Sequence, residues 1–235
     1  MAKGTLYLIP TVIAEQSVHK VIPDQVKDEL KHIQHFLAEN IRTARRYLSS
    51  LKLYDSIEAL HFDVLDKDTS PELLGQLLQP IQEGHDMGIL AEAGCPGVAD
   101  PGTMAVQYAH QHNIKVVPLV GPSSLLLALM ASGMGGQQFA FHGYLPIPVK
   151  EAEKAIRELE RESAVKKQTQ IFIETPYRNN VLFARLTNVL RADTVLCVAL
   201  DLTGPSEQIR SLTVSQWRKE SIEWPKLPAI FLFSA

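Results

Sequence analysis

The fold of this chain is decided by the stretch DMGILAEAGCPGVADPG, residues 86–102. Its first part is a short apolar run, which is typical of a buried strand. The loop that follows contains three glycines and two prolines, whereas an ordinary turn needs one or two such residues. A helix-like pattern begins at Thr103. We therefore predict a strand, then a loop whose shape is adapted to a bound group, and then a helix.

Strands and helices alternate in the same way on both sides of this loop. The expected strands are residues 5–9, 35–39, 56–62, 86–92 and 114–120. The expected helices between them are residues 23–33, 43–51, 70–82 and 103–112. This alternation predicts an α/β domain with a largely parallel sheet over residues 1–118.

The C-terminal half has a different order of elements. Buried helix 125–134 is expected to follow the break GPSS, residues 121–124. The next elements are strand 137–145, helix 150–162, strand 170–174, helix 176–190 and strands 193–202, 206–214 and 227–235. Two of the last strands follow each other without a helix, so we predict a second α/β domain, residues 119–235, with a mixed sheet.

Composition and charge restrict the class of protein. The 235 residues are 46% hydrophobic and 21% charged, which is ordinary for a globular protein. The net charge of −3 provides no overall basic field, so tight nonspecific binding of nucleic acid is disfavoured. This net charge is still compatible with an enzyme that contacts RNA through a local basic patch.

The cysteines and the apolar segments indicate a cytoplasmic protein. Cys95 and Cys197 are far apart and suit two free thiols in a reducing compartment. The apolar segment 116–149 is interrupted at Gly121-Pro122, so it lacks the run of about 20 apolar residues that a membrane helix needs. The N-terminus has no long apolar signal region, and we expect no membrane segment.

Several familiar catalytic and binding motifs are absent from the sequence. It contains neither GxxxxGK[ST] nor GxGxxG, which disfavours a nucleoside triphosphate or a dinucleotide. It also lacks the HExxH and CxxC spacings of metal sites and the GxSxG of serine hydrolases. We expect no metal site.

Three loops are expected at the carboxyl ends of strands, where α/β sheets bind their ligands. They contain Pro10-Thr11, residues 93–102 and residues 121–124. Gly94 and Gly97 would let the main chain approach a ligand closely. Ser123 and Ser124 either cap the following helix or present their amides to a carboxylate.

Seven motifs occur in order along the chain: IPT, AENIR, AEAGCPGVADPG, VVPLVGPSS, FAFHGYLP, FIETPYR and ALDLTGPSE. Together they resemble the tetrapyrrole-methylase superfamily of S-adenosylmethionine-dependent methyltransferases. They are most similar to the branch that methylates a ribose 2′-hydroxyl in small-subunit ribosomal RNA. The resemblance spans nearly the whole chain and implies two α/β domains, a cofactor cleft between them and a homodimer.

The resemblance also implies which residues contact S-adenosylmethionine. These are Pro10, Ala93, Gly94, Cys95, Val98, Ser123, Ser124, Glu174 and Leu202. A compact, bent cofactor needs main chain on several sides, and large side chains would fill its space. This need would explain the glycines of the loop.

Methyl transfer from a sulfonium mainly requires alignment of the reacting atoms, which contributes about 7–11 kcal/mol. A hydroxyl acceptor additionally needs a base or a polarising cation. The candidates are Glu39, Arg42, Tyr177 and Arg178, together with Glu174. Two of them also suit purely structural roles, because Glu39 could cap a helix and Arg178 could be a solvated helix charge.

The sequence departs from the pattern of the RNA-methylating branch at several places. Glu92 and Cys95 stand where the branch has Asp and Thr, and Asn40 stands in place of Asp. Ala14 replaces a glycine, and Gly204 replaces a lysine. Three hypotheses therefore stay open: an RNA methyltransferase, a methyltransferase of a small tetrapyrrole-like acceptor, and a non-catalytic member that binds cofactor.

Overall fold

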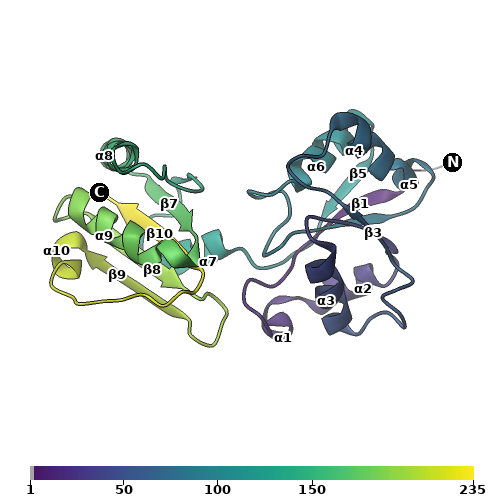
Figure 1. Cartoon of the computed structure of the whole chain (residues 1–235), viewed down its shortest axis with the longest axis horizontal. Helices are drawn as coiled ribbons and strands as arrows, with labels where there is room; N and C mark the ends of the chain where they lie inside the picture. The colour runs from purple at the N-terminus through teal and green to yellow at the C-terminus, as the bar shows by residue number, and fades with distance from the viewer. Residues whose placement is uncertain (1–2) are drawn as a thin grey trace. The chain divides into compact units, whose positions relative to one another are not determined.

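The computed structural model describes residues 3–235, and its contacts cluster into two compact units (Figure 1). The first unit is Met1–Ser123 and the second is Ser124–Ala235. Each unit contains a five-stranded sheet with helices, so the predicted α/β class is confirmed. The predicted domain limits, 1–118 and 119–235, stay a prediction.

The first unit is built on a fully parallel sheet with the strand order β3-β2-β4-β1-β5. Its strands are β1 (Thr5–Ile9), β2 (His35–Ala38), β3 (His61–Val64), β4 (Met87–Leu90) and β5 (Lys115–Pro118). Leu6 pairs with Met87 and with Val116, which places β1 between β4 and β5. The predicted parallel sheet is confirmed.

Helices cover both faces of this sheet, as Figure 1 shows. They are α1 (Val18–Val21), α2 (Asp24–Leu30), α3 (Ile41–Leu51), α4 (Pro71–Leu77), α5 (Gln79–Gln82) and α6 (Gly102–Gln111). Ile9 and Phe36 pack against α2 and α3, while Leu6 and Leu37 pack against α4, α5 and α6. Both faces of the strands are therefore apolar, as is typical of a parallel sheet.

Two predictions of secondary structure in the first unit need correction, and one short helix was missed. Residues 56–60 form a turn, and β3 begins only at His61, because Leu60 packs into the core from that turn instead of extending the strand. The helix expected over 70–82 is divided into α4 and α5, since Pro80 has no N–H with which to continue α4. Helix α1 was not predicted.

The second unit contains a mixed sheet with the order β6-β7-β10-β8-β9. Its strands are β6 (Phe139–Phe141), β7 (Thr169–Glu174), β8 (Val195–Leu200), β9 (Gln208–Thr213) and β10 (Ala229–Ser234). Strands β6 and β7 are parallel, whereas β10 is antiparallel to β7 and β8, and β8 is antiparallel to β9. The predicted mixed sheet is confirmed.

The helices of the second unit also lie on two faces of their sheet. They are α7 (Ser124–Ser132), α8 (Val149–Lys166), the 3₁₀ helix η1 (Pro176–Arg178), α9 (Asn179–Val189) and α10 (Val214–Trp217). Phe172, Phe231 and Trp217 belong to the core under α8 and α9, and Ile171 belongs to the core under α7. Helix α7 was predicted to be buried, but only one of its sides is. On the other side, Met130 is 79% exposed, so the prediction was wrong for that side.

Three histidine rings lie side by side at the amino ends of neighbouring strands in the first unit, and two of them are stacked. The ring centroids of His35 and His61 are 4.7 Å apart with planes at 15°, and His85 lies 5.2 Å from His35. Burial lowers the pKa of His35, and the neighbouring imidazoles lower it further. The carboxylates of Asp63 and Glu83 oppose this shift with smaller effects.

We expect the first unit to lose stability when the pH falls from about 7.5 to about 5.5. His35 has a lower pKa in the folded chain than in the unfolded chain, so the unfolded chain binds more protons in this range. Urea unfolding at the two pH values measures the effect. His35→Gln should reduce the loss, whereas His19→Gln, at an exposed position, should leave it unchanged. An equal loss in all three proteins would contradict the prediction.

Candidate functional site

The three loops predicted at strand ends meet in the first unit. The amide of Thr11 donates to the carbonyl of Gly94 at 2.9 Å, and the Thr11 hydroxyl donates to the carbonyl of Ala91 at 3.1 Å. A Cβ at Gly121 would lie 2.1 Å from the Cβ of Pro10. Only glycine therefore allows the segment after β5 to approach the end of β1.

Gly94 lies where the loops that follow β4 and β5 touch. Its φ is +76°, and a Cβ would lie 3.3 Å from the carbonyl oxygen of Pro122. The thiol of Cys95 donates to the same carbonyl at 3.3 Å. Gly97 also has a positive φ, +79°, but no atom lies within 4 Å of the position that a Cβ would occupy there. The loop therefore uses glycine both for backbone conformation and for close approach.

Asp100 fixes the shape of this loop. Its Oδ1 accepts the amide of Gly97 at 2.6 Å and the amide of Gly102, the first residue of α6, at 2.9 Å. Burial raises the pKa of the Asp100 carboxyl, and the two amide hydrogen bonds oppose that shift. Sequence reasoning did not select Asp100, although an aspartate directly before Pro-Gly at a helix start is a known signal for such a turn.

The cofactor candidates of the first unit differ in accessibility. Ala93 and Val98 are exposed, Cys95 is half-buried, and Gly94 and Pro10 are buried. Burial, and then the charge of Asp100, raise the pKa of the Cys95 thiol. This thiol therefore stays protonated at neutral pH and is not an activated nucleophile.

Tyr47 of α3 holds the end of β1. Its hydroxyl donates to the carbonyl of Pro10 at 2.8 Å, and the side chain is 8% exposed. We expect Tyr47→Phe to destabilise the protein by about 1–3 kcal/mol, because a buried carbonyl loses its donor. Urea denaturation measures this loss. Tyr144→Phe is the matched control, since Tyr144 is 59% exposed, and an equal effect of both changes would contradict the prediction.

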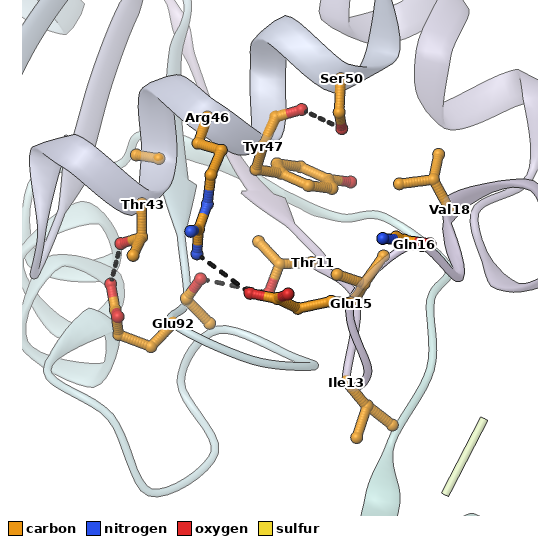
Figure 2. Close-up of a pocket in the computed structure, with 13 residues that line it drawn as sticks. Thr11, Ile13, Glu15, Gln16, Val18, Thr43, Arg46, Tyr47, Ser50 and Glu92 are labelled. Atoms are coloured by element: carbon orange, nitrogen blue, oxygen red, sulfur yellow. Dashed lines mark hydrogen bonds and ion pairs between the residues drawn. The ribbon is translucent and has the colours of Figure 1, made fainter. Parts of the chain in front are cut away.

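A pocket of about 430 Å³ lies beside these loops, between the loop after β1, helix α3 and the end of β4 (Figure 2). The Thr43 hydroxyl donates to Glu92 Oε1 at 2.6 Å, and Arg46 pairs with Glu15 at 3.5 Å. The lining residues are Thr11, Val12, Ile13, Glu15, Gln16, Val18, Thr43, Ala44, Arg46, Tyr47, Ser50, Ala91 and Glu92. Sequence reasoning placed Thr11 in a strand-end loop but selected none of the lining residues as a ligand contact.

The catalytic candidates of the first unit lie at the start of α3. Asn40 caps this helix, because its Oδ1 accepts the amides of Arg42 at 3.0 Å and Thr43 at 3.4 Å. The alternative in which Glu39 caps the helix is therefore wrong. Glu39 and Arg42 are both exposed. Asparagine and aspartate cap helices equally well, so Asn40 preserves the local structure that aspartate would give.

Glu174 and Arg178 form an ion pair in the second unit. Arg178 Nη2 lies 3.0 Å from Glu174 Oε2, and their side chains are 30% and 1% exposed. The amide of Thr175 donates to Glu174 Oε1 at 2.7 Å. The alternative of a solvated charge at Arg178 is therefore wrong. Tyr177 is 79% exposed, with the ammonium of Lys226 5.4 Å from its ring centroid.

The remaining candidates lie near the chain junction and in the loop after β8. Ser123 and Ser124 are half-buried, and Leu202 is 4% exposed in the core under α7. A Cβ at Gly204 would lie 2.3 Å from both carboxylate oxygens of Asp201. Any other residue at 204 therefore requires the Asp201 side chain to move.

Three further features concern the described part of the chain. Within residues 3–235, no group of three His, Cys, Asp or Glu side chains is placed to hold a metal ion. Over the same residues, no helix combines the length and the apolar character that crossing a membrane requires. Cys95 and Cys197 are free thiols.

Two solved structures share this fold. The methyltransferase CobJ covers 98% of this chain and 94% of its own, with a TM-score of 0.64 and 16% identity. The uroporphyrin-III C-methyltransferase from Thermus thermophilus, complexed with S-adenosylhomocysteine, covers 98% and 97%, with a TM-score of 0.57 and 16% identity. The fold is therefore that of the tetrapyrrole methyltransferases.

Curated proteins that are similar in sequence are methyltransferases as well. The ribosomal RNA small subunit methyltransferase I of Vibrio cholerae is 28% identical over 90% of this chain and 69% of its own. The protein of the same name from Escherichia coli O157:H7 is 29% identical over 93% of this chain and 73% of its own. Over most of its length the chain is therefore similar in sequence to these RNA methyltransferases. No protein-family model matches the sequence.

Proposed function

We propose that this chain is an S-adenosylmethionine-dependent methyltransferase that methylates a ribose 2′-hydroxyl of small-subunit ribosomal RNA. The observation that carries the proposal is the loop around Gly94, held by Thr11 and Asp100 at the carboxyl ends of the strands. The named relatives support ribosomal RNA as the substrate. Similarity to tetrapyrrole methyltransferases at 16% identity concerns the fold alone and does not favour a tetrapyrrole acceptor.

The residues of the loop suit the cofactor. Gly97 leaves main chain uncovered, and Val98 is a 50% exposed apolar side chain beside it. We propose that Pro10, Ala93, Gly94, Cys95, Val98 and Ser123 of the first unit, and Ser124, Glu174 and Leu202 of the second, contact the bound molecule. When bound, S-adenosylmethionine supplies a methyl group on a positively charged sulfur.

The ion pair between Glu174 and Arg178 in the second unit bears on which residue acts on the acceptor hydroxyl. Both oxygens of Glu174 are already engaged, by Arg178 and by the amide of Thr175, so Glu174 is disfavoured as a base. Glu174 instead holds the guanidinium of Arg178 in place as a fixed cation. We propose Arg178 and the neighbouring Tyr177 as catalytic groups, with Glu39 and Arg42 as the candidates from the first unit.

Two measurements test the proposed function. Isothermal titration with S-adenosylmethionine should show binding, and no heat at millimolar ligand would exclude the cofactor. Radiolabelled cofactor and small ribosomal subunits from a strain that lacks this gene should give a labelled ribose, located by mass spectrometry. Binding without any transferred label would instead support the non-catalytic hypothesis raised by Ala14 and Gly204.

We also propose a homodimer that acts in the cytoplasm, where ribosomal subunits are assembled. Strands β7, β8 and β10 are largely buried inside the core of the second unit, so a dimer would use other surfaces. Exposed apolar side chains such as Leu126 and Met130 of α7 suit such a surface. Sedimentation equilibrium measures the mass directly, and a monomer at micromolar concentration would exclude the dimer.

A further inference from the structure

We propose that the pocket beside α3 receives the base of the acceptor nucleotide after this base has turned out of the RNA. This inference rests on the proposed function and adds to it a site and a class of ligand. Methyltransferases that act inside folded nucleic acid extrude their target nucleotide into a pocket of the enzyme. A base held in this way would position its own ribose next to the methyl donor.

The position of the pocket is the first argument. Thr11 lines the pocket, and its amide donates to the carbonyl of Gly94 in the loop assigned to the cofactor. Ile13 also lines the pocket and lies 4.0 Å from the Cβ position of Gly94. The two sites therefore share the segment after β1. A ribose at their border would be near both the base and the methyl group.

The charge of the pocket is the second argument. Two carboxylates, Glu15 and Glu92, lie among its lining residues together with a single guanidinium, Arg46. This excess of negative charge disfavours a phosphate group as the occupant. The same carboxylates are acceptors for the exocyclic amino groups and ring N–H groups of a base. A neutral ring with amino groups therefore fits the lining better than the RNA backbone does.

The size and the shape of the pocket are the third argument. Its volume of about 430 Å³ accommodates a purine or a pyrimidine with part of its ribose. The walls include the apolar side chains of Val12 and Val18, and Figure 2 shows the Tyr47 ring at the pocket between Thr43 and Ser50. The Tyr47 hydroxyl is held by the carbonyl of Pro10, so this wall is fixed before the ligand arrives. A flat aromatic ligand suits such a pocket.

Filling the pocket tests this inference. Ser50 lines the pocket at an exposed position of α3, so Ser50→Trp would place a bulky ring inside it. We expect KM for small ribosomal subunits to rise by about tenfold or more, with binding of S-adenosylmethionine unchanged. Ser49→Trp is the matched control, because Ser49 is the adjacent exposed serine and does not line this pocket. This control should behave as the wild-type protein does.

A second measurement separates this inference from the proposed function. The four ribonucleosides at millimolar concentration serve as probes, and saturation-transfer NMR detects contact between their base protons and the protein. We expect transfer with the wild-type protein and with Ser49→Trp, but not with Ser50→Trp. This result without methylation of ribosomal subunits would refute the proposed function and leave the base-binding pocket standing. Normal KM in Ser50→Trp, or nucleoside contact that Ser50→Trp does not change, would overturn the pocket alone.

Discussion

Gly94→Val is expected to weaken the binding of S-adenosylmethionine by about tenfold to a hundredfold. A β-branched residue at φ of +76° is strained by about 1–3 kcal/mol, and its Cβ would press on the carbonyl oxygen of Pro122. The loop would relieve this strain by moving away from the Thr11 amide that now binds the Gly94 carbonyl. Isothermal titration measures the change in Kd.

Gly135→Ala is the control for this substitution. No atom lies within 4 Å of a Cβ at that position, and its φ is outside the positive range. The control should bind the cofactor as the wild-type protein does. Unchanged binding by Gly94→Val would show that the loop around Gly94 is not the cofactor site, whatever the acceptor is.

Arg178→Ala is expected to lower the free energy of unfolding by about 3–5 kcal/mol, in addition to any loss of methyl transfer. The substitution leaves the carboxylate of Glu174, which is 1% exposed, without its opposite charge. The amide of Thr175 compensates only in part, because it donates to the other oxygen. Urea denaturation followed by tryptophan fluorescence measures the loss, since Trp217 and Trp224 both lie in the core of the second unit.

A double-mutant cycle separates structure from catalysis at this pair. Glu174→Gln removes the carboxylate charge, so Arg178→Ala should cost much less stability in that background. If Arg178 acts on the acceptor, Glu174→Gln/Arg178→Ala would recover stability but not kcat. A double variant with wild-type kcat would show that Arg178 has a structural role only. Equal losses of stability in both backgrounds would mean that the ion pair does not stabilise the fold.

The sequence predicted the arrangement of strands better than the limits of individual elements. Alternation of apolar strands with helices was sufficient for the parallel sheet, because each strand had to be buried on both faces. The errors arose where tertiary contacts decided the local structure. Leu60 reads as part of a strand but reaches the core from a turn, and Pro80 divides a segment whose apolar pattern is continuous.

The candidate site was predicted less completely than the fold. Glycines and prolines indicated the loop around Gly94, because these residues reveal backbone conformation. The side chains that hold the loop, Asp100 and Tyr47, were missed because each acts on a backbone group that spacing does not identify. The burial of the ion pair between Glu174 and Arg178 could not be predicted either, because it depends on how the second unit packs.

The close approach of Gly204 to Asp201 restricts how this chain can change. A Cβ at 204 would meet the Asp201 carboxylate, and that carboxylate also accepts the amide of Ser206 at 2.9 Å. Grafting the lysine that the resemblance implies at 204 would therefore displace the Asp201 side chain from the Ser206 amide, unless residue 201 is substituted as well. We therefore expect substitutions at 201 and 204 to be coupled, so an engineer who introduces the lysine should change both positions together.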